Sequence, residues 1–471
     1  MLKRAETRAR ELEERVPPVL TNQGFLHLWL AQIISQTAQN AILYTLIIRV
    51  IDLTGSTATT SGVVLAFVVP TVVFGIFSGV LVDRWSKRRI LIITNAGRAI
   101  AALAFFFGRD HVWALYTITV VFASFSQLFT TTNAASIPYM VSRQQLISAN
   151  SLFSLGFTIA QIAGLIFLAP LILKTTGVAQ LFIICMIAFL VATLLARLLP
   201  PIGHDGEQEG DGVLPGRAEL RGAVSELMKA LNTLRADPIA YLAMAHIAIS
   251  STMVLIFAVL VPGYMQEVLQ RPPEDAVAVF APVAFGALLG LRAVPWIVPR
   301  LGHTKTVALG LFGLAICLAA FGSVELIADA LERTDRFNPF GTEQIFGQSI
   351  LVSITVLVAG PMGVFYALLN APAQTLLHER TPTEMRGRIF ASQMVLANGV
   401  ALIPLVVVGG IADQYGVSRV VLAIAVLIAF AGALSLYLEQ RWLRGRPPTS
   451  GGSSPEWAAP HQAVSGSIDT T

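Results

Sequence analysis

The sequence predicts an all-α membrane protein whose twelve transmembrane helices form two six-helix bundles. Three observations lead to this prediction. The 471 residues are 55% hydrophobic and only 13% charged, whereas a soluble protein carries about 25% charge. The mean hydropathy is +0.69. The apolar residues also fall into long runs, which one polar segment divides evenly.

Twelve runs approach the roughly 20 apolar residues that a helix needs to cross a bilayer core of about 30 Å. Because each run is long and nearly uncharged, we expect each to form one spanning helix. The predicted spans are 25–48, 58–82, 90–108, 112–137, 150–173, 178–199, 239–265, 276–298, 305–322, 348–369, 389–412 and 420–438.

The polar segment 200–238 separates the runs into two sets of six. We therefore predict a cytoplasmic N-terminal segment (1–24), a first bundle (25–199), a linker with an amphipathic helix (200–238), a second bundle (239–438) and a disordered cytoplasmic tail (439–471). The two halves look like repeats, since an Asn-Ala pair falls near the end of the fourth run (Asn133) and of the tenth run (Asn370). Parallel repeats of six spans are a transporter architecture.

Lysine and arginine set the predicted orientation. If both termini lie inside, the inner segments hold most of the basic residues, and the outer segments hold few. The outer ones are Arg49, Arg109, Lys174, Arg271, Arg333, Arg336 and Arg419. This bias predicts a multi-pass protein of the cell (cytoplasmic) membrane with both termini in the cytoplasm. The net charge of +4 does not indicate nucleic-acid binding, because the basic residues sit in short loops and form no continuous patch.

The loop between the second and third runs is the most specific local signal. It contains a glycine, an acid and several basic residues at an inner corner: Gly79, Asp83, Arg84, Arg88 and Arg89. A glycine allows close helix approach, and an acid beside basic residues can pair with neighbouring charges and helix ends. We predict a conformational lock here; the alternative is an ordinary basic loop.

This loop resembles the signature loop of the major facilitator superfamily. The resemblance implies the fold of that family, and it implies that Asp83, Arg84 and Arg88 help to lock an outward-open state. Segments 133–138, 148–151 and 385–390 look like the branch that contains bacterial macrolide-efflux proteins and the enterobactin exporter. In the family, the first, fourth, seventh and tenth helices line the central cavity.

The sequence departs from this family pattern in three places. The fourth run lacks the arginine that many proton-coupled drug exporters carry there. Ala160 and Gln161 stand where the antiporter motif has Gly-Pro, and Pro299 stands where the second-half loop would have its acid. Proton antiport is therefore an expectation from the family alone.

Polar residues inside the runs are costly in lipid, so each should face a cavity or a neighbouring helix. The candidates for the substrate path are Gln32, Gln36, Gln39, Asn40, Gln127, Gln161, His246, Ser250, Arg292, Tyr366, Asn370, Gln374 and Asn398. Interhelical hydrogen bonding alone is the alternative for each. His246 is the best titratable candidate, because no acid falls within the spans. Arg98 and Arg292 could contact an anionic substrate or be structural.

No P-loop, metal-ligand cluster or nucleophile motif is present, so we predict no enzyme activity, no cofactor, no metal site and no use of ATP. The predicted function is alternating-access export of an amphipathic, drug- or macrolide-like small molecule, with protons as the coupling ion. The alternative is an exporter or flippase of an anionic metabolite, siderophore or lysophospholipid. A transport-inactive sensor is a competitor from another class.

Overall fold

The computed structural model describes residues 19–201, 237–332, 344–345, 348–381 and 386–444, with isolated positions between 222 and 235. Most of the described chain is helical, as hydrocarbon requires, because a helix satisfies its own backbone hydrogen bonds. The expected amphipathic helix of the linker and the expected disorder of the tail fall on residues that lie mostly outside this description.

The first bundle begins with a short turn at Val19–Thr21 and ends with α8. Asn22 accepts a hydrogen bond from the amide of Phe25 and so caps α2, and Gly55, at φ 63°, ends it. The elements are η1 (Val19–Thr21), α2 (Gln23–Thr54), α3 (Thr57–Arg84), α4 (Lys87–Gly108), α5 (Val112–Met140), η2 (Arg143–Gln145), α6 (Leu146–Ile162), η3 (Ala163–Leu168), α7 (Ala169–Thr175) and α8 (Val178–Arg197).

The second bundle repeats this plan from α10 to α16. Its elements are α10 (Pro238–Glu267), η4 (Pro273–Asp275), α11 (Ala276–Leu301), α12 (His303–Gly322), α13 (Val324–Glu332), β1 (Gln344–Ile345), β2 (Gln348–Ser349), α14 (Ile350–Arg380), α15 (Arg386–Tyr415) and α16 (Val417–Arg444). The two short strands pair antiparallel between α13 and α14.

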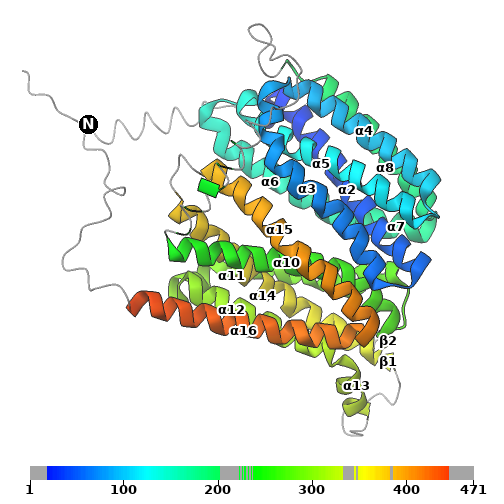
Figure 1. Ribbon diagram of the computed structural model, residues 1–471, viewed down its shortest axis with the longest axis vertical. Coiled ribbons are helices and arrows are strands. Elements are labelled where there is room, and N and C mark those ends of the chain that lie inside the picture. The colour runs from blue at the N-terminus through cyan, green and yellow to red at the C-terminus, as the bar shows by residue number, and fades with distance from the viewer. Residues whose placement is uncertain are drawn as a thin grey trace, which may run out of the picture.

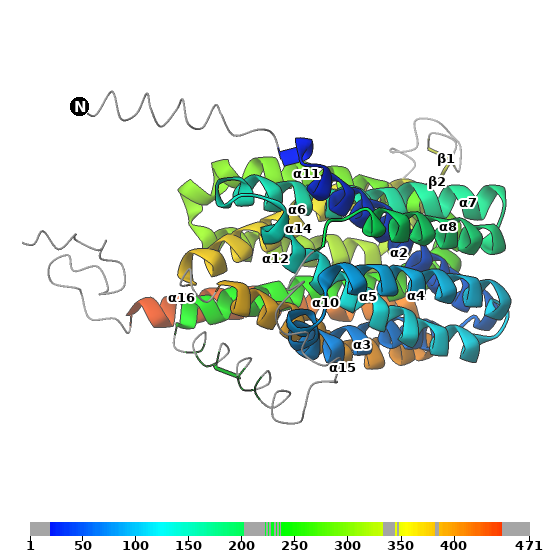
Figure 2. The ribbon, with the colours of Figure 1, turned by 90° about the horizontal axis from the view of Figure 1, so that it is seen from above.

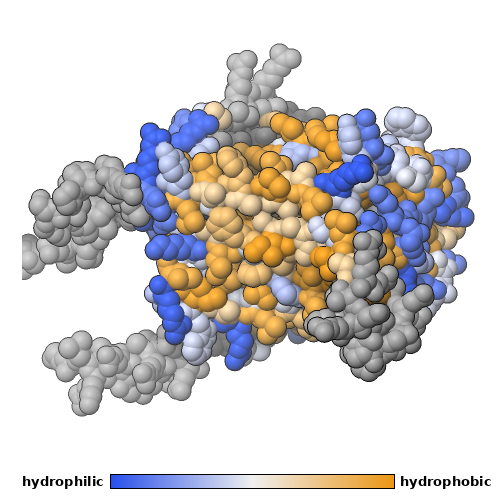
Figure 3. Space-filling model, turned by 90° about the horizontal axis from the view of Figure 1, so that it is seen from below, coloured by the Kyte–Doolittle hydropathy of each residue, from blue (hydrophilic) through white to orange (hydrophobic). Residues whose placement is uncertain are grey.

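Eleven helices in the described residues are long and apolar enough to cross a membrane. The remaining predicted span lies in α2, which has 32 residues but carries a series of glutamine and asparagine side chains. The prediction of twelve spans is thus confirmed to within one helix. Figure 3 shows the matching surface, an apolar band between two hydrophilic ends.

The fifth span differs from the prediction of one regular helix. It consists of α6, a π-helical segment η3 and α7. The widened turn falls where Gly164 approaches α2: a methyl group added at Gly164 would lie 2.5 Å from the backbone oxygen of Thr37. π-helical turns are rare and are frequently found at functional sites.

The long helices of both bundles run along one common direction (Figure 2). We call the end where α3 passes into α4 the linker end, and the end where α2 passes into α3 the opposite end. The two bundles converge at the opposite end and diverge toward the linker end (Figure 1). Apolar residues of both bundles pack together between these ends, including Ile47 and Val64 from the first and Val259 and Leu405 from the second.

Candidate functional site

Most of the polar candidates lie on α2 and α5 in the first bundle and on α10 and α14 in the second. These helices are the first, fourth, seventh and tenth long helices of the chain. On α2, the polar residues lie about one to four turns toward the linker end from Leu43 and Ile47, which belong to or pack on the apolar cluster shared by both bundles. The 3.6-residue period keeps the two sets on one broad face.

Two glutamines of α2 bind other helices of their own bundle. The side-chain nitrogen of Gln32 donates to the carbonyl of Phe153 at 3.1 Å, and that of Gln36 donates to the Thr130 hydroxyl at 3.3 Å. Both glutamines are at most 2% exposed. Their Oε1 atoms are buried without a hydrogen-bond partner. A buried acceptor without a partner is costly. Each of these glutamines can therefore accept a further hydrogen bond through its Oε1 atom, for example from a solute.

Gln127 lies beside the contact between α3 and α15. Its amide nitrogen donates to the Thr131 hydroxyl at 3.3 Å, and the Ser78 hydroxyl donates to the same oxygen at 3.0 Å. A methyl group added at Gly75 would lie 3.5 Å from the Gln127 nitrogen and 3.4 Å from Val395 of the second bundle. The Ser78–Thr131 bond thus joins α3 and α5, and Gln127 supports Thr131 next to a cross-bundle contact.

Arg98 of α4 is fully buried in the middle of the first bundle. Its guanidinium donates to Ser35 Oγ at 2.9 Å, to Asn95 Oδ1 at 2.6 Å and to Gln39 Oε1 at 3.4 Å. It also lies over the rings of Phe129 and Phe189, 4.0 and 4.8 Å from their centroids. Arg98 therefore packs among helices of its own bundle, and its bond to Gln39 connects it to the candidate face of α2.

Asn40 and Gln161 both lie near the π-helical segment of the fifth span, Asn40 on α2 and Gln161 on the preceding α6. Asn40 is half-buried, and its Cβ would be 2.8 Å from a methyl group added at Gly164. Gln161 is exposed on the last turn of α6. The Ala160-Gln161 pair departs from the family pattern in sequence, but the π-helical segment has no signal there, because helical periodicity does not reveal one extra residue in a turn.

The second bundle brings four of its candidates into one hydrogen-bonded chain. Asn370 donates to Ser250 Oγ at 3.2 Å and to the Tyr366 hydroxyl at 3.0 Å, and Gln374 donates to Asn370 Oδ1 at 2.7 Å. Ser250 is fully buried and Gln374 is exposed. The chain therefore leads from the interior of the bundle toward the linker end. His246, one turn before Ser250, is 3% exposed.

Arg292 and Asn398 lie on other helices than this hydrogen-bonded chain. Arg292 is exposed on the face of α11 that also carries Leu289 and Trp296, whose exposures are 64% and 68%. Asn398 is half-buried on α15. The structure therefore separates Arg292 from the polar groups of α10 and α14.

Arg88 of the predicted lock loop contacts its own bundle. Arg88 donates to the backbone carbonyl of Arg197 at the end of α8, and Arg89 is exposed. Gly79, Asp83 and Arg84 belong to the last turns of α3, and their side chains lie outside the described part.

Lys87, which the sequence analysis did not select, is 6% exposed, and its Nζ lies 4.7 Å from the centroid of the Tyr139 ring. The sequence did not predict this burial, because a run of basic residues is usually exposed to solvent.

At the opposite end, Asp413 and Lys174 each join the two bundles. The Asp413 carboxylate of α15 accepts hydrogen bonds from the Ser56 hydroxyl (2.6 Å) and from the amides of Thr57 (2.6 Å) and Ala58 (3.1 Å). It thus caps the N-terminus of α3, where a negative charge is favourable. Lys174 at the end of α7 pairs with Asp275 before α11. Neither contact was predicted, because each joins residues far apart in sequence.

Acidic groups of both bundles meet near these contacts. Asp52, four residues beyond the end of the first predicted span, has its pKa raised to about 6. Desolvation is the largest cause, the Glu274 carboxylate of the other bundle adds to it, and Arg49 opposes it. A cavity of about 610 Å³ lies between the bundles at this end and is lined by residues that include Glu267 and Asp413.

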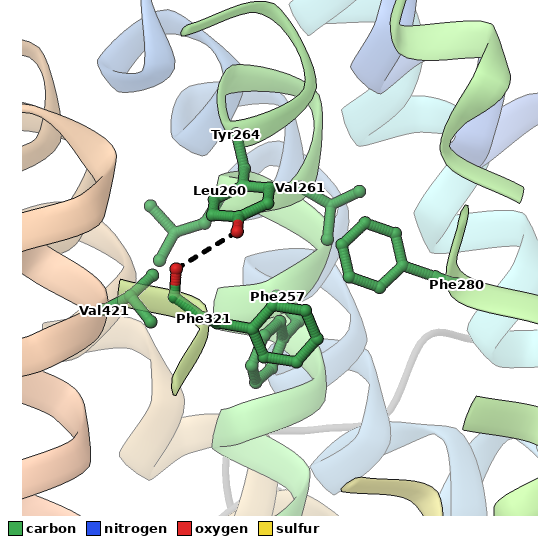
Figure 4. A pocket seen from close by; sticks show the side chains of 7 residues that line it. All are labelled: Phe257, Leu260, Val261, Tyr264, Phe280, Phe321 and Val421. Atoms are coloured by element: carbon green, nitrogen blue, oxygen red, sulfur yellow. Dashed lines mark hydrogen bonds between the residues drawn. The ribbon is translucent and has the colours of Figure 1, made fainter. Parts of the chain in front are cut away.

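In the part of the chain that the structure describes, no group of three His, Cys, Asp or Glu side chains could hold a metal ion, and both cysteines are free and buried. A small apolar cavity of about 10 Å³ lies among Phe257, Tyr264, Phe280 and other side chains, and Tyr264 donates to the Phe321 carbonyl at 3.1 Å (Figure 4). This space is too small for a solute.

Two six-helix bundles with polar groups on their facing helices define a multi-pass transporter fold. Residues 28–333 match the model of the Major Facilitator Superfamily, and the chain belongs to this family. It is 22% identical over 89% of its length to an uncharacterized MFS-type transporter, YfiS, of Bacillus subtilis (strain 168), and the match covers 94% of that protein. It is 23% identical over 82% of its length to the multidrug efflux pump Tap of Mycolicibacterium fortuitum, with 88% of Tap covered.

Solved structures share the fold at low identity. A point mutant of the nucleoside transporter NupG superposes with a TM-score of 0.67 at 14% identity, covering 88% of this chain and 99% of that one. An auto-inhibited POT family peptide transporter gives a TM-score of 0.65 at 13% identity, with 89% and 97% covered. The predicted fold is confirmed by these similarities.

Proposed function

We propose that this chain is a secondary active transporter that exports an amphipathic small molecule across the cytoplasmic membrane. The observation that carries the proposal is a hydrogen-bonded polar group in the middle of otherwise apolar helices of each bundle: Gln36 with Thr130, and Asn370 with Ser250 and Tyr366. Uncharged donors and acceptors among apolar side chains suit an amphipathic solute. Similarity to the multidrug efflux pump Tap supports this substrate class.

The proposed mechanism is alternating access, with the two bundles rocking about the solute. The predicted orientation places the linker end in the cytoplasm, so the contacts of Asp413 and Lys174 would close the outer side. The conformation would then be inward-facing. Contact of Arg88 with Arg197 of its own bundle agrees with a released cytoplasmic lock in this state. Asp83 and Arg84 would complete that lock when the inner side closes.

Proton coupling belongs to the proposal as a family expectation. No aspartate or glutamate occupies the middle of a described span, which leaves His246 as the titratable candidate close to the Ser250 chain. The proposed partners are the solute, the bilayer and protons. Neither ATP nor a cofactor is required by this mechanism.

The second candidate is export or flipping of an anionic metabolite, siderophore or lysophospholipid. The observation that favours it is Arg98, a fully buried cation whose described partners are all uncharged. Both candidates use the same helices and differ in the charge of the solute.

Uptake of a panel of fluorescent amphipathic compounds into inverted membrane vesicles, with and without a pH gradient, tests the proposal. We expect accumulation of at least one compound, stimulated by an acidic vesicle lumen. The variants Asn370→Leu and Gln374→Leu should lower the flux about tenfold or more, because they break the polar chain of α14. The matched control is Gln180→Leu, which removes an exposed glutamine at the opposite end. An unchanged flux in both α14 variants would remove these residues from the path.

A further inference from the structure

The apolar interior of the first bundle is interrupted by a polar layer at its centre. One buried cluster lies toward the linker end and includes Leu28, Leu91 and Phe129. The other lies toward the opposite end and includes Ala38 and Phe122. Arg98, with its partners Ser35 and Asn95, lies between the two clusters. The second bundle has one continuous cluster instead.

The charge of Arg98 has no acidic partner in the described structure. Its three hydrogen-bond acceptors are a hydroxyl and two amide oxygens, its two ring contacts are phenyl groups, and its Nε is buried without a partner. Carboxylates of the described spanning helices lie near the helix ends, as Asp52, Glu267 and Asp413 do. The centre of the first bundle therefore holds a net positive charge.

Such a charge acts over a distance. Two unit charges interact more strongly as the local dielectric constant falls, and the membrane interior lacks the mobile ions that screen charges in water. A solute that passes along α2 would therefore sense Arg98 without touching it. The field attracts a negative group and repels a positive one.

Gln39 connects Arg98 to the face of α2 that holds the polar candidates. Its Oε1 accepts from Arg98, so its amide nitrogen keeps two donor hydrogens for other groups. Gln39 is half-buried, unlike Gln32 and Gln36. It lies one turn from Leu43, which packs on the apolar cluster shared by the two bundles. A solute beside Gln39 would thus meet the amide donors of this residue, whereas the unpaired Oε1 atoms of Gln32 and Gln36 are buried.

We infer that Arg98, acting through the first bundle's field and through Gln39, selects the charge of the solute. This rests on the proposed transport function. The preferred solute is an amphipathic anion with acceptor oxygens such as carboxylate, phosphate or carbonyl groups. A neutral solute of the same shape is transported less well, and a permanent cation is excluded. Arg98 is a positioning and field-setting residue, since it is too buried for direct contact in this conformation.

The test uses three dyes built on one apolar fluorophore, with side groups of charge −1, 0 and +1, in proteoliposomes containing the full chain. Transport rates and KM are measured for each dye. We expect a preference of about tenfold per unit charge, which corresponds to about 1.4 kcal/mol. The preference should persist in Arg98→Lys and collapse in Arg98→Met, mainly through KM. Gln39→Glu, which places an acid beside Arg98, should also collapse it.

Arg419→Gln is the matched control, because Arg419 is exposed at the opposite end, and it should leave the dye preference unchanged. Equal transport of the cation and the anion by the unmodified protein would overturn the inference while leaving transport intact. The same holds if Arg98→Met folds and keeps the anion preference. If Arg98→Met does not fold, the comparison of the unmodified protein with Gln39→Glu decides. Failure of all three dyes to cross would overturn the proposed export, and the charge inference with it.

Discussion

The two bundles share one helical plan but are held together by different interactions. In the first bundle, a buried arginine and several amides bridge the helices, and they divide the apolar core in two. In the second bundle, α11, α12 and α14 approach until their backbones touch at several glycines, whereas among the described glycines of the first bundle only Gly164 approaches another helix's backbone in this way. A methyl group at Gly290 would lie 2.7 Å from the carbonyl oxygen of Val364, and one at Gly310 would lie 2.6 Å from the amide nitrogen of Leu369.

This difference in contacts suggests that the two bundles have different roles, one in rigidity and the other in selectivity for the solute. Contacts through small residues gain dispersion energy from close packing and leave no room for adjustment. Contacts through long polar side chains can be rearranged, since an amide can exchange one partner for another. We therefore interpret the second bundle as the stiffer unit, and the first as the bundle that carries the electrostatic discrimination.

The largest effect should come from glycines in the α11–α14 contact. A methyl group added at Gly286 would overlap the carbonyl oxygen of Gly360, and one at Gly363 would overlap that of Val283. Because backbone atoms cannot move aside as flexible side chains can, Gly286→Ala and Gly363→Ala should each cost about 3 kcal/mol. We expect a strong loss of monodisperse protein in detergent and a lower melting temperature.

Gly410→Ala is the control for this prediction, because an added methyl group there meets no atom within 4 Å. It should leave the melting temperature unchanged or raise it slightly through helix propensity. If Gly286→Ala and Gly410→Ala melt alike, the second bundle is not fixed by backbone contact, and the contrast between the bundles fails.

Hydropathy alone predicted most of the fold, because the need to satisfy backbone groups in lipid leaves few other structures. Prediction from hydropathy was least accurate in the spans that carry polar candidates for the solute path. α2, with its glutamines, is not among the described helices that are long and apolar enough to cross a membrane, and the fifth span contains a π-helical segment. Helix ends also extend past the predictions, as in α14, which runs to Arg380 instead of residue 369.

Part of the candidate site could be predicted from spacing within a helix. Residues four apart share a face, and Tyr366, Asn370 and Gln374 do bond to one another along α14. Partners on other helices could not be predicted, since they depend on how helices cross. The cap of α3 by Asp413, 356 residues away from Thr57, is such a case.

The next largest effect should come from Asp413, which joins the bundles through three hydrogen bonds. Removing a helix cap costs about 0.5–2 kcal/mol, so Asp413→Ala should increase opening at the opposite end about tenfold. Val259 is fully buried in the cross-bundle apolar cluster. Labelling of a Val259→Cys reporter with a membrane-impermeant maleimide measures that opening.

Glu267→Ala is the matched control for Asp413→Ala. The Glu267 carboxylate accepts hydrogen bonds from the amide of Val417, so it caps α16 within its own bundle. Its loss should lower stability without speeding the labelling. Faster labelling in Glu267→Ala, or none in Asp413→Ala, would show that the cap of α3 does not hold the bundles together.

The smallest effect should come from Lys174, which occupies the position in the first bundle that Asp413 occupies in the second, at the end of the fifth span. Its pair with Asp275 is solvated, with side-chain exposures of 52% and 24%. Exposed ion pairs contribute about 0–1 kcal/mol, so Lys174→Met should speed labelling of the Val259→Cys reporter by about twofold, and high salt should reduce the difference. The charge-swapped pair Lys174→Asp with Asp275→Lys should restore the original rate. An effect as large as that of Asp413→Ala would mean that the two bundles contribute equally to closure, because a solvated pair would then equal a helix cap.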